Sequence, residues 1–345
     1  MSFHSEILEQ PDVLEKLLSH QMQAIQNVAQ RVKQQDVKYL FIAARGTSDN
    51  SARYAKYLFG IRNRIPVALA APSHFTIYKS PPKLEGALVI GISQSGQSPD
   101  IVSVLAEGKR QGRPTLAITN APDSPLAKTA DYVIDVQAGK EAAVAASKTY
   151  TAQLMTLAML SSALQGDRQE LQVLKSVPGW GRQVLELDET IRQAAPRYRY
   201  MDQCVVLGRG YNYATAYEWS LKTKELSYVI AEPYSSADFQ HGPVALVEKG
   251  YPVLAVAPSG PILDHMMELL AFLCKERHAE LVVISDQDST LELAELPLRL
   301  PAGIPDWVSP IIAVMPGQLF VYHLTIAKGL DPNAPRGLSK VTETH

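Results

Sequence analysis

The segment KYLFIAARGTSDNSARYAKYL (residues 38–58) decides the fold class, because an apolar strand, a glycine turn and a helical pattern follow one another directly. The segment QCVVLGRGYNYATAYEWSLK (residues 203–222) has the same order. Gly46 of the first segment matches Gly210 of the second at an offset of 164 residues. A repeat of this length predicts two structural units with one architecture.

Two further landmarks keep this spacing. Gly96 matches Gly260 at an offset of 164, and Asp123 matches Asp288 at an offset of 165. Each copy has the order strand, turn, helix, strand, turn, helix, strand, and its strands are continuous runs of Val, Ile, Leu and Ala. Such runs indicate parallel strands that are covered on both faces. We therefore predict an α/β protein with two similar doubly wound parallel-sheet domains, each an αβα sandwich.

The chain has 345 residues, which is enough for two hydrophobic cores. Helical periodicity before and between the two copies predicts helices there, and the Pro- and Gly-rich end predicts irregular structure. The predicted organisation is an N-terminal helical region (1–35), a first domain (36–160), a helical connector (161–195), a second domain (196–330) and a C-terminal tail (331–345).

Composition excludes several classes of protein. Apolar residues make up 46% and charged residues 20% of the chain, which argues against disorder. The formal net charge of −2 comes without a run of Lys or Arg, so no positive field attracts nucleic acid or anionic lipid. The two cysteines, Cys204 and Cys274, stand in apolar surroundings and are interpreted as core residues of a protein in a reducing compartment.

The N-terminal stretch MSFHSEILEQPDVLEK has acidic residues where an export signal needs a basic start and an apolar run. The most apolar long stretch, residues 308–324, is interrupted by Pro310, Pro316 and Gly317, so it is predicted to be buried protein and not a bilayer span. We expect a cytoplasmic protein that binds neither membranes nor nucleic acid.

The turn GISQSGQSPD (residues 91–100) follows an apolar strand and is rich in small polar groups. A turn from a parallel strand into a helix points backbone N–H groups outward, and the helix dipole adds positive charge, so the place favours an anion. The hydroxyl and amide groups suit a phosphate, although turn formation and helix capping would explain them too. They belong to Ser93, Gln94, Ser95 and Ser98.

The other turn of the first copy, ARGTSDNS, brings Thr47 and Ser48 to a strand end, whereas APSGPI in the second copy has far fewer hydroxyls. The chain lacks the G-x-x-x-x-G-K-[ST] motif, and GRGYNYA lacks the third glycine of the dinucleotide fingerprint. We predict a small phosphate ester as ligand of the first domain, with no nucleotide cofactor.

The helix ATAYEWSLKTKELSYVI of the second copy carries charged groups near a predicted apolar stripe. Glu225 falls inside the stripe, with Glu218 and Lys222 at its border. Burial would raise the pKa of the Glu225 carboxyl and suit it to proton transfer. The alternative is a surface ion pair of Glu218 with Lys222, with Glu225 exposed. The stripe itself consists of Ala214, Tyr217, Leu221 and Tyr228.

The sequence SSADFQHGPVALV places His241 before a Gly-Pro turn, where a structural hydrogen bond is the simplest role. The remaining histidines show no metal-ligand spacing, so no metal is implied. They include His74, His265, His278 and His323.

Together these segments resemble the sugar isomerase (SIS) family, in particular the isomerase half of glucosamine-6-phosphate synthase, the SIS-type glucosamine-6-phosphate deaminases and the fructosamine-phosphate deglycases. The resemblance runs from about Lys38 to Lys340. It rests on ARGTSDNS, SQSGQSPD, GKEAAVAASKTYTAQL, EWSLKTKELSY, FQHGPVALV and DPNAPRGLSKVT.

The resemblance implies roles for individual residues. The Glu of the K-x-K-E helix moves a proton between C1 and C2 of the sugar, which implies Glu225, with Lys222 nearby. The His of H-G-P assists ring opening, which implies His241, and the Lys of P-R-x-L-x-K implies Lys340 in the same site. The implied phosphate-binding residues are Ser93, Gln94, Ser95, Ser98, Thr47 and Ser48. No cofactor is needed, and the family's shared active sites imply a homodimer.

Two departures from the family bear on the substrate. The family motif V-A-S-T-K aligns with residues 144–148, which implies Val144 and Ser147 in substrate binding but puts Ala146 where the family has a hydroxyl. The chain begins with Ser2 after Met1 and has roughly 35 residues before its first strand, so we expect no glutaminase activity. The favoured reaction is glucosamine 6-phosphate to fructose 6-phosphate and ammonia. The alternatives are a fructosamine-6-phosphate deglycase and a non-enzymatic sugar-phosphate sensor.

Overall fold

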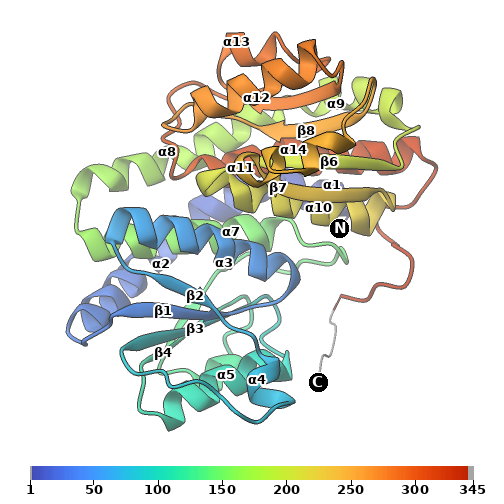
Figure 1. The fold of residues 1–345 in the computed structure, drawn as a ribbon. Helices are drawn as coiled ribbons and strands as arrows, with labels where there is room; N and C mark the ends of the chain where they lie inside the picture. Colours follow the sequence, from blue (N-terminus) through green and yellow to red (C-terminus); the bar gives the residue numbers. More distant parts are fainter. Residues whose placement is uncertain (1, 341–345) are drawn as a thin grey trace. The chain divides into compact units, whose positions relative to one another are not determined.

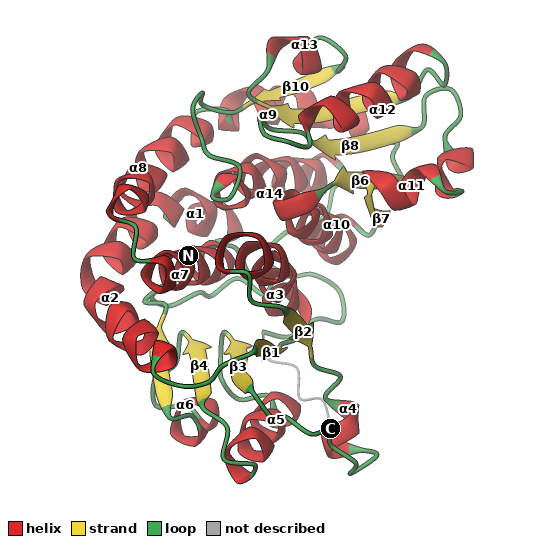
Figure 2. Ribbon diagram, turned by 60° about the vertical axis from the view of Figure 1, so that its left-hand side comes forward, coloured by secondary structure: helices red, strands yellow, loops and turns green. Residues whose placement is uncertain are grey.

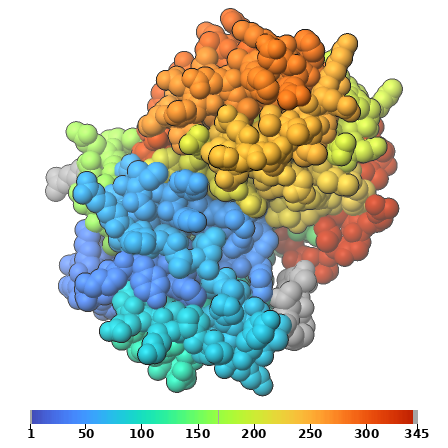
Figure 3. Space-filling model, viewed as in Figure 1, coloured from blue at the N-terminus to red at the C-terminus, as the bar shows by residue number. Residues whose placement is uncertain are grey.

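The computed structural model describes residues 2–340, which form two compact units (Figure 1). Unit 1 contains the second sequence repeat, and its described residues are 2–8, 143–145 and 177–338. Unit 2 contains the first repeat, and its described residues are 9–142, 146–176 and 339–340. Figure 3 shows one face of the molecule with all atoms drawn as spheres.

Unit 2 is built on a five-stranded parallel sheet with the order β2-β1-β3-β4-β5. The register places Ile42 of β1 beside Ile90 of β3, and Gly91 of β3 beside Ala117 of β4. The three central strands are almost entirely buried, as continuous apolar runs require. The strands are β1 (Tyr39–Ala43), β2 (Val67–Leu69), β3 (Ala87–Ser93), β4 (Thr115–Thr119) and β5 (Tyr132–Asp135).

Helices cover both faces of this sheet. Figure 2 shows α5 and α6 on one face and α3 and α7 on the other. Val89 and Ala117 point to the α5 side, where they pack with Ile101 and Leu105 in one buried cluster. The helices of unit 2 are α2 (Gln10–Lys33), α3 (Gly46–Leu58) with a π-helical turn (Phe59–Asn63), α4 (Ser73–Thr76), α5 (Pro99–Arg110), α6 (Pro125–Thr129) and α7 (Lys148–Gln165); α8 (Arg168–Leu185) begins in unit 2 and ends in unit 1.

The sheet of unit 1 has the order β7-β6-β8-β9-β10 and is also parallel, so it repeats the topology of unit 2. Helix α12 packs on one face through Leu270 and Leu273, against Val205 and Val253. Helix α10 covers the other face and packs on α14. The strands are β6 (Gln203–Gly208), β7 (Ile230–Ser235), β8 (Pro252–Val256), β9 (Glu280–Ser285) and β10 (Leu296–Arg299).

Besides the helices that cover its sheet, unit 1 contains the N-terminal helix and the long helix α14. Its α-helices are α1 (Phe3–Leu8), α9 (Asp188–Ala194), α10 (Tyr213–Ser227), α11 (Ser236–Gln240), α12 (Leu263–Lys275), α13 (Asp288–Leu291) and α14 (Ser309–Ala327). Its 3₁₀ turns are Ala195–Tyr198, Gly210–Asn212 and Pro243–Leu246.

The predicted fold class, two doubly wound parallel α/β domains, is confirmed. The repeat pattern predicts three strands for each sheet, whereas each sheet has five. The additional edge strands lack a continuous apolar run: β2 has three residues, β7 contains Pro233, and the burial of β10 alternates. Edge strands tolerate proline and exposure because one side of their backbone is unpaired.

Helix α14 contains the apolar stretch that the sequence predicts to be buried. Among residues 2–340 it is the helix with the length and apolar composition to cross a bilayer, and 83% of that stretch is buried within the protein. Pro316 and Gly317 do not interrupt the helix. Gly317 lies against the indole of Trp219 on α10, where a Cβ would come within 3.1 Å of the ring. The stretch is therefore a core helix of unit 1.

Candidate functional site

The strand order places a candidate binding position in each sheet. In a doubly wound sheet, ligands bind beyond the carboxyl ends of the strands, where the chain switches direction across the sheet. In unit 2 this switch lies between β1 and β3, and in unit 1 it lies between β6 and β8. The turns after β1 and β3 are the two hydroxyl-rich turns of the first repeat.

The turn after β3 is held by its own serines. The N–H of Gly96 donates to Ser93 Oγ over 3.1 Å, and the N–H of Gln97 donates to Ser95 Oγ over 3.3 Å. Ser98 is the N-cap residue of α5, yet its side chain makes no capping hydrogen bond. Helix capping therefore does not account for the Ser98 hydroxyl. Gln94 is half-buried in the same turn.

The conformation of this turn depends on Gly96. Its φ is +62°, and a Cβ at this position would lie 2.1 Å from Ser124 Oγ. Ser124 is itself fixed, because its Oγ accepts a hydrogen bond from the N–H of Ala127 at the start of α6. Only glycine fits this position without displacing Ser124.

The turn after β1 is joined to the turn after β3 by an ion pair. Arg45 Nε lies 2.7 Å from Asp100 Oδ2, and Asp100 is buried whereas Arg45 is exposed. Ser48 is buried, and its Oγ accepts a hydrogen bond from Gln153 Nε2 of α7 over 3.0 Å. Thr47 is half-buried in the first turn of α3. Sequence reasoning missed Arg45, although its place directly before Gly46 puts a cation at this strand end.

The turn of unit 1 that matches Gly46 is closed by a side chain. A Cβ built on Gly210 would lie 2.3 Å from Cδ1 of Ile262, whereas a Cβ on the equivalent Gly46 would meet nothing within 4 Å. The cavity beside Gly210, lined by Arg209, Tyr211 and Ile262 among others, has a volume of about 30 Å³. That volume holds a water molecule or two, not a sugar phosphate. The turn at Gly46 of the first repeat is therefore more open than the matching turn at Gly210.

Helix α10 carries a buried lysine between two glutamates. Lys222 Nζ lies 2.6 Å from Glu225 Oε2 and 3.4 Å from Glu218 Oε1. The side chains of Lys222 and Glu218 are 1% and 0% exposed, and that of Glu225 is 25% exposed. The predicted pairing of Glu218 with Lys222 is confirmed, but its predicted place on the surface and the predicted apolar stripe are wrong. The stripe residues Tyr217, Leu221 and Tyr228 are only half-buried, and the Glu218–Lys222 pair is fully buried instead of lying on the surface.

The charges around Lys222 decide its protonation. Burial by itself would lower the pKa of the Lys222 ammonium, but the negative charges of Glu218 and Glu225, with their hydrogen bonds, outweigh burial and raise the pKa above its usual value. Lys222 is therefore a cation at neutral pH. It can stabilise negative charge or donate a hydrogen bond, but it cannot act as a base.

His241 ends α11, and its backbone N–H donates to the carbonyl of Asp238 over 3.1 Å. The residue is exposed, and a 3₁₀ turn beginning at Pro243 follows it. The structure places His241 in unit 1, the unit that also contains Glu225.

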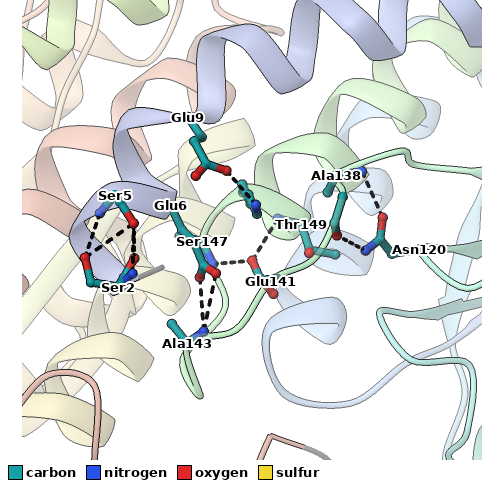
Figure 4. Close-up of polar contacts among 12 residues, drawn as sticks. Ser2, Ser5, Glu6, Glu9, Asn120, Ala138, Glu141, Ala143, Ser147 and Thr149 are labelled. Carbon is teal, nitrogen blue, oxygen red and sulfur yellow. Dashed lines mark hydrogen bonds and ion pairs between the residues drawn. The ribbon is translucent and has the colours of Figure 1, made fainter.

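In unit 2, the tail lysine reaches a buried carboxylate. Lys340 Nζ lies 2.8 Å from Oε2 of Glu141, whose side chain is fully buried. The Oε1 atom of Glu141 accepts hydrogen bonds from the N–H groups of Ser147 and Thr149, each over 3.0 Å (Figure 4). Glu141 thus caps the N-terminus of α7, where a negative charge is favourable. Sequence reasoning missed this residue, because it precedes the helix by several positions.

The segment aligned with the family motif is mostly buried. Ser147 is the N-cap residue of α7, but its hydroxyl is buried without a hydrogen-bond partner, because Glu141 caps the helix in its place. Val144 and Ala146 are half-buried. Lys148 is buried, and its Nζ lies 2.6 Å from the carboxylate of Glu9, the residue just before α2 that Figure 4 labels. Ala146 has no hydroxyl of its own, and the hydroxyl of the neighbouring Ser147 is buried.

The fold and these residues define a class of protein: a duplicated doubly wound α/β chain with open polar turns in one repeat and a Glu–Lys–Glu array in the other. The sequence model of the SIS domain matches residues 35–163 and 199–328. The chain belongs to the SIS (sugar isomerase) family and contains two copies of its domain.

Its relatives include enzymes of amino-sugar phosphates. The chain is 34% identical to the isomerizing glutamine–fructose-6-phosphate aminotransferase of Thermococcus kodakarensis, over 97% of this chain and 56% of that protein. It spans little more than half the length of the curated relatives it matches. The solved C-terminal domain of glucosamine-fructose-6-phosphate aminotransferase from Francisella tularensis is 30% identical, with a TM-score of 0.85 over 95% of this chain and 96% of that one.

A third relative shows the fold alone. The structure of glucosamine-6-phosphate deaminase from Thermotoga maritima matches with a TM-score of 0.82 over the full length of both chains, at 21% identity. The sequence-based resemblance to the isomerase half of the aminotransferase and to SIS phosphosugar enzymes is confirmed.

Proposed function

We propose that this protein is a phosphosugar isomerase that acts on an amino-sugar 6-phosphate and converts glucosamine 6-phosphate and water to fructose 6-phosphate and ammonia. The observation that carries the proposal is the buried Lys222 cation in contact with Glu225. An aldose–ketose isomerisation needs a base for the carbon proton and a fixed cation for the anion that forms.

The turns of the first repeat are assigned to the phosphate. They combine backbone N–H groups at the start of α5, the hydroxyls of Ser93, Ser95 and Ser98, and the exposed guanidinium of Arg45. Thr47, Ser48 and Gln94 belong to the same two turns. The open space beside Gly46, compared with the closed position beside Gly210, supports this assignment.

The proposed chemistry proceeds in three steps. His241 transfers a proton during opening of the sugar ring, which leaves an aldehyde at C1 and an amine at C2. The Glu225 carboxylate takes the C2 proton and returns it to C1, so C1 becomes an alcohol and C2 an imine. Lys222 stabilises the oxygen anion of the intermediate. Water then adds to the imine carbon and ammonia leaves, which gives the ketose. The family resemblance implies a role for Lys340 in this reaction, and in unit 2 its ammonium pairs with Glu141.

The test is a coupled assay of ammonia and fructose 6-phosphate released from glucosamine 6-phosphate. We expect equal amounts of both products from the wild-type protein, and a loss of about 10²-fold or more in kcat for Glu225→Gln. Lys222→Met should lower kcat by a similar factor. Lys224→Met is the matched control, because Lys224 lies two residues away on the exposed side of α10. If the wild-type protein releases no ammonia, the proposal fails.

The second candidate reaction is deglycation of a fructosamine 6-phosphate. Ala146, with no hydroxyl of its own and the Ser147 hydroxyl buried beside it, favours a C2 substituent different from the one that the family motif recognises. Release of a free amino acid from a fructosamine 6-phosphate, with no ammonia from glucosamine 6-phosphate, would establish this reaction instead. If both compounds bind in a thermal-shift assay and neither is converted, the protein is instead a non-enzymatic sugar-phosphate sensor.

A further inference from the structure

A cluster of metal-ligand side chains lies in unit 1, on elements that carry none of the residues assigned to catalysis. His4 comes from α1, Asp188 is the first residue of α9, and His323 comes from α14. Helix α14 packs on both α1 and α9. We propose that His4, Asp188 and His323 form a binding site for a divalent transition metal, with zinc as the best fit.

The ligand atoms are already gathered at one point. His4 Nε2 lies 2.8 Å from Asp188 Oδ2, and His323 Nε2 lies 2.6 Å from Asp188 Oδ1. The ligand atoms of the three residues all lie within 4.8 Å of one another. Zinc binds imidazole nitrogen and carboxylate oxygen at about 2.0–2.2 Å in a tetrahedron, so its ligand atoms stand about 3.4 Å apart. The two His–Asp contacts would each have to lengthen by less than about 1 Å to reach this spacing.

The type of ligand favours zinc. Two imidazoles and one carboxylate form the three-ligand set of open zinc sites, in which water or another ligand occupies the fourth position. Imidazole also selects against calcium and magnesium, which prefer oxygen ligands alone. The side chains of His4 and Asp188 are each 27% exposed, so solvent has access, whereas His323 is 8% exposed and fixed on a core helix.

Surrounding groups orient the ligands. The ring of His4 stacks on Tyr322 with a centroid distance of 4.6 Å, and the backbone N–H of Phe3 donates to Asn333 Oδ1 over 2.8 Å. These contacts hold the short helix α1 beside α14. Without a metal, the two imidazoles each share a hydrogen bond with Asp188, and a purely structural triad of this kind is the competing interpretation.

The sequence does not show this site. His4 and Asp188 are 184 residues apart, and Asp188 and His323 are 135 residues apart. Metal-ligand spacing is recognisable only when ligands lie on one local motif. The fold is what brings these three residues together.

The experiment uses the full chain without a histidine tag, treated with a chelator and then titrated with Zn²⁺ by calorimetry and with Co²⁺ by visible absorption. We expect one equivalent of metal at this site, with the intense visible bands of tetrahedral cobalt. His4→Gln, Asp188→Asn and His323→Gln should each weaken binding by about 100-fold or more. His265→Gln, an exposed histidine of α12, is the matched control and should bind as the wild-type protein does.

A second measurement separates metal binding from folding. Zn²⁺ should raise the melting temperature of the wild-type protein and of His265→Gln, and should not raise that of His4→Gln, whose side chain is partly exposed and near the N-terminus. If the wild-type chain binds no Zn²⁺, or if His4→Gln and Asp188→Asn bind it as tightly as the wild-type chain, the three residues are only a hydrogen-bonded triad and the proposal is overturned.

Discussion

Lys222 and Glu225 form a contact of 2.6 Å between an ammonium that is 1% exposed and a carboxylate that is 25% exposed, one turn apart on α10. Glu218, which is fully buried, shares the same ammonium. Replacing Lys222 by Met leaves the buried Glu218 without this cation. We expect the free energy of unfolding in urea to fall by about 3–5 kcal/mol, as for other broken buried ion pairs. Lys224→Met should change it by less than about 0.5 kcal/mol.

A double substitution tests the interpretation of this loss. Glu218→Gln removes the buried negative charge, so combining it with Lys222→Met should recover a large part of the stability. If the two losses simply add, the buried charge is not the cause.

Cys204 gives a pH-dependent prediction. Burial raises the pKa of its thiol to about 12 from an ordinary value of 9.0. The folded state therefore holds the proton more tightly than the unfolded state. This contribution to stability is complete below pH 9 and is lost as the pH rises from 9 to 12. Between pH 8 and 10.5, the unfolding free energy of the wild-type protein should fall by about 2 kcal/mol more than that of Cys204→Ala.

The same residue can be checked by thiol labelling. At pH 8 a thiol reagent should modify the half-buried Cys274 well before Cys204, which should react only on unfolding. Equal labelling rates in the native protein would show that Cys204 is not protected.

The phosphate assignment is tested with a matched pair of serines, one from each repeat. Ser95 and Ser259 each precede the glycine of their turn, Gly96 and Gly260. Ser95→Ala should raise the KM for glucosamine 6-phosphate, or the Kd for fructose 6-phosphate, by roughly 10-fold or more, since hydrogen bonds to charged groups are the strong ones. Ser259→Ala should leave both constants unchanged. An equal effect of the two substitutions would contradict the assignment.

The turn glycines differ in what surrounds them. Both Gly46 and Gly96 have positive φ, at +51° and +62°, but only Gly96 lies against Ser124. Gly46→Ala should cost about 1–2 kcal/mol of unfolding free energy through backbone strain alone. Gly96→Ala should cost clearly more in the same urea titration. Adding Ser124→Gly should remove the excess, and a Gly96→Ala loss that Ser124→Gly does not reduce would point to another cause.

The assembly can be tested by mixing inactive variants. We expect a homodimer with shared active sites, so Glu225→Gln and His241→Ala proteins, each inactive alone, should regain part of the wild-type activity after co-refolding. The control is each variant refolded with itself. If the mixture stays inactive while a hybrid dimer is present, each site is self-contained.

Much of the fold could be predicted because the repeat is long and its landmarks keep their spacing. The offset from Gly46 to Gly210 fixes two copies of one architecture, and the continuous apolar runs fix the parallel central strands. The edge strands could not be predicted in the same way. Their residues are partly exposed or interrupted by proline, so they carry no periodic signal.

The candidate site was less predictable, because its charged residues are buried with partners that are distant or unexpected. From their polarity, Glu218 and Lys222 were expected at the border of the apolar stripe of α10. Because their opposite charges pair, both side chains are fully buried instead. Glu141 could not be paired with Lys340 from sequence, since 199 residues separate them. Buried charges need a partner, but a partner that is distant in the sequence can be identified only from the three-dimensional structure.

Ile262 makes the turn after β6 differ from the equivalent turn after β1. The two repeats share one backbone plan at their switch points, and the difference between an open and a closed turn is the side chain that faces Gly210. Shortening Ile262, for example to Ala, would give the turn at Gly210 the open space that Gly46 already has, and so would place two equivalent turns for comparison within one chain.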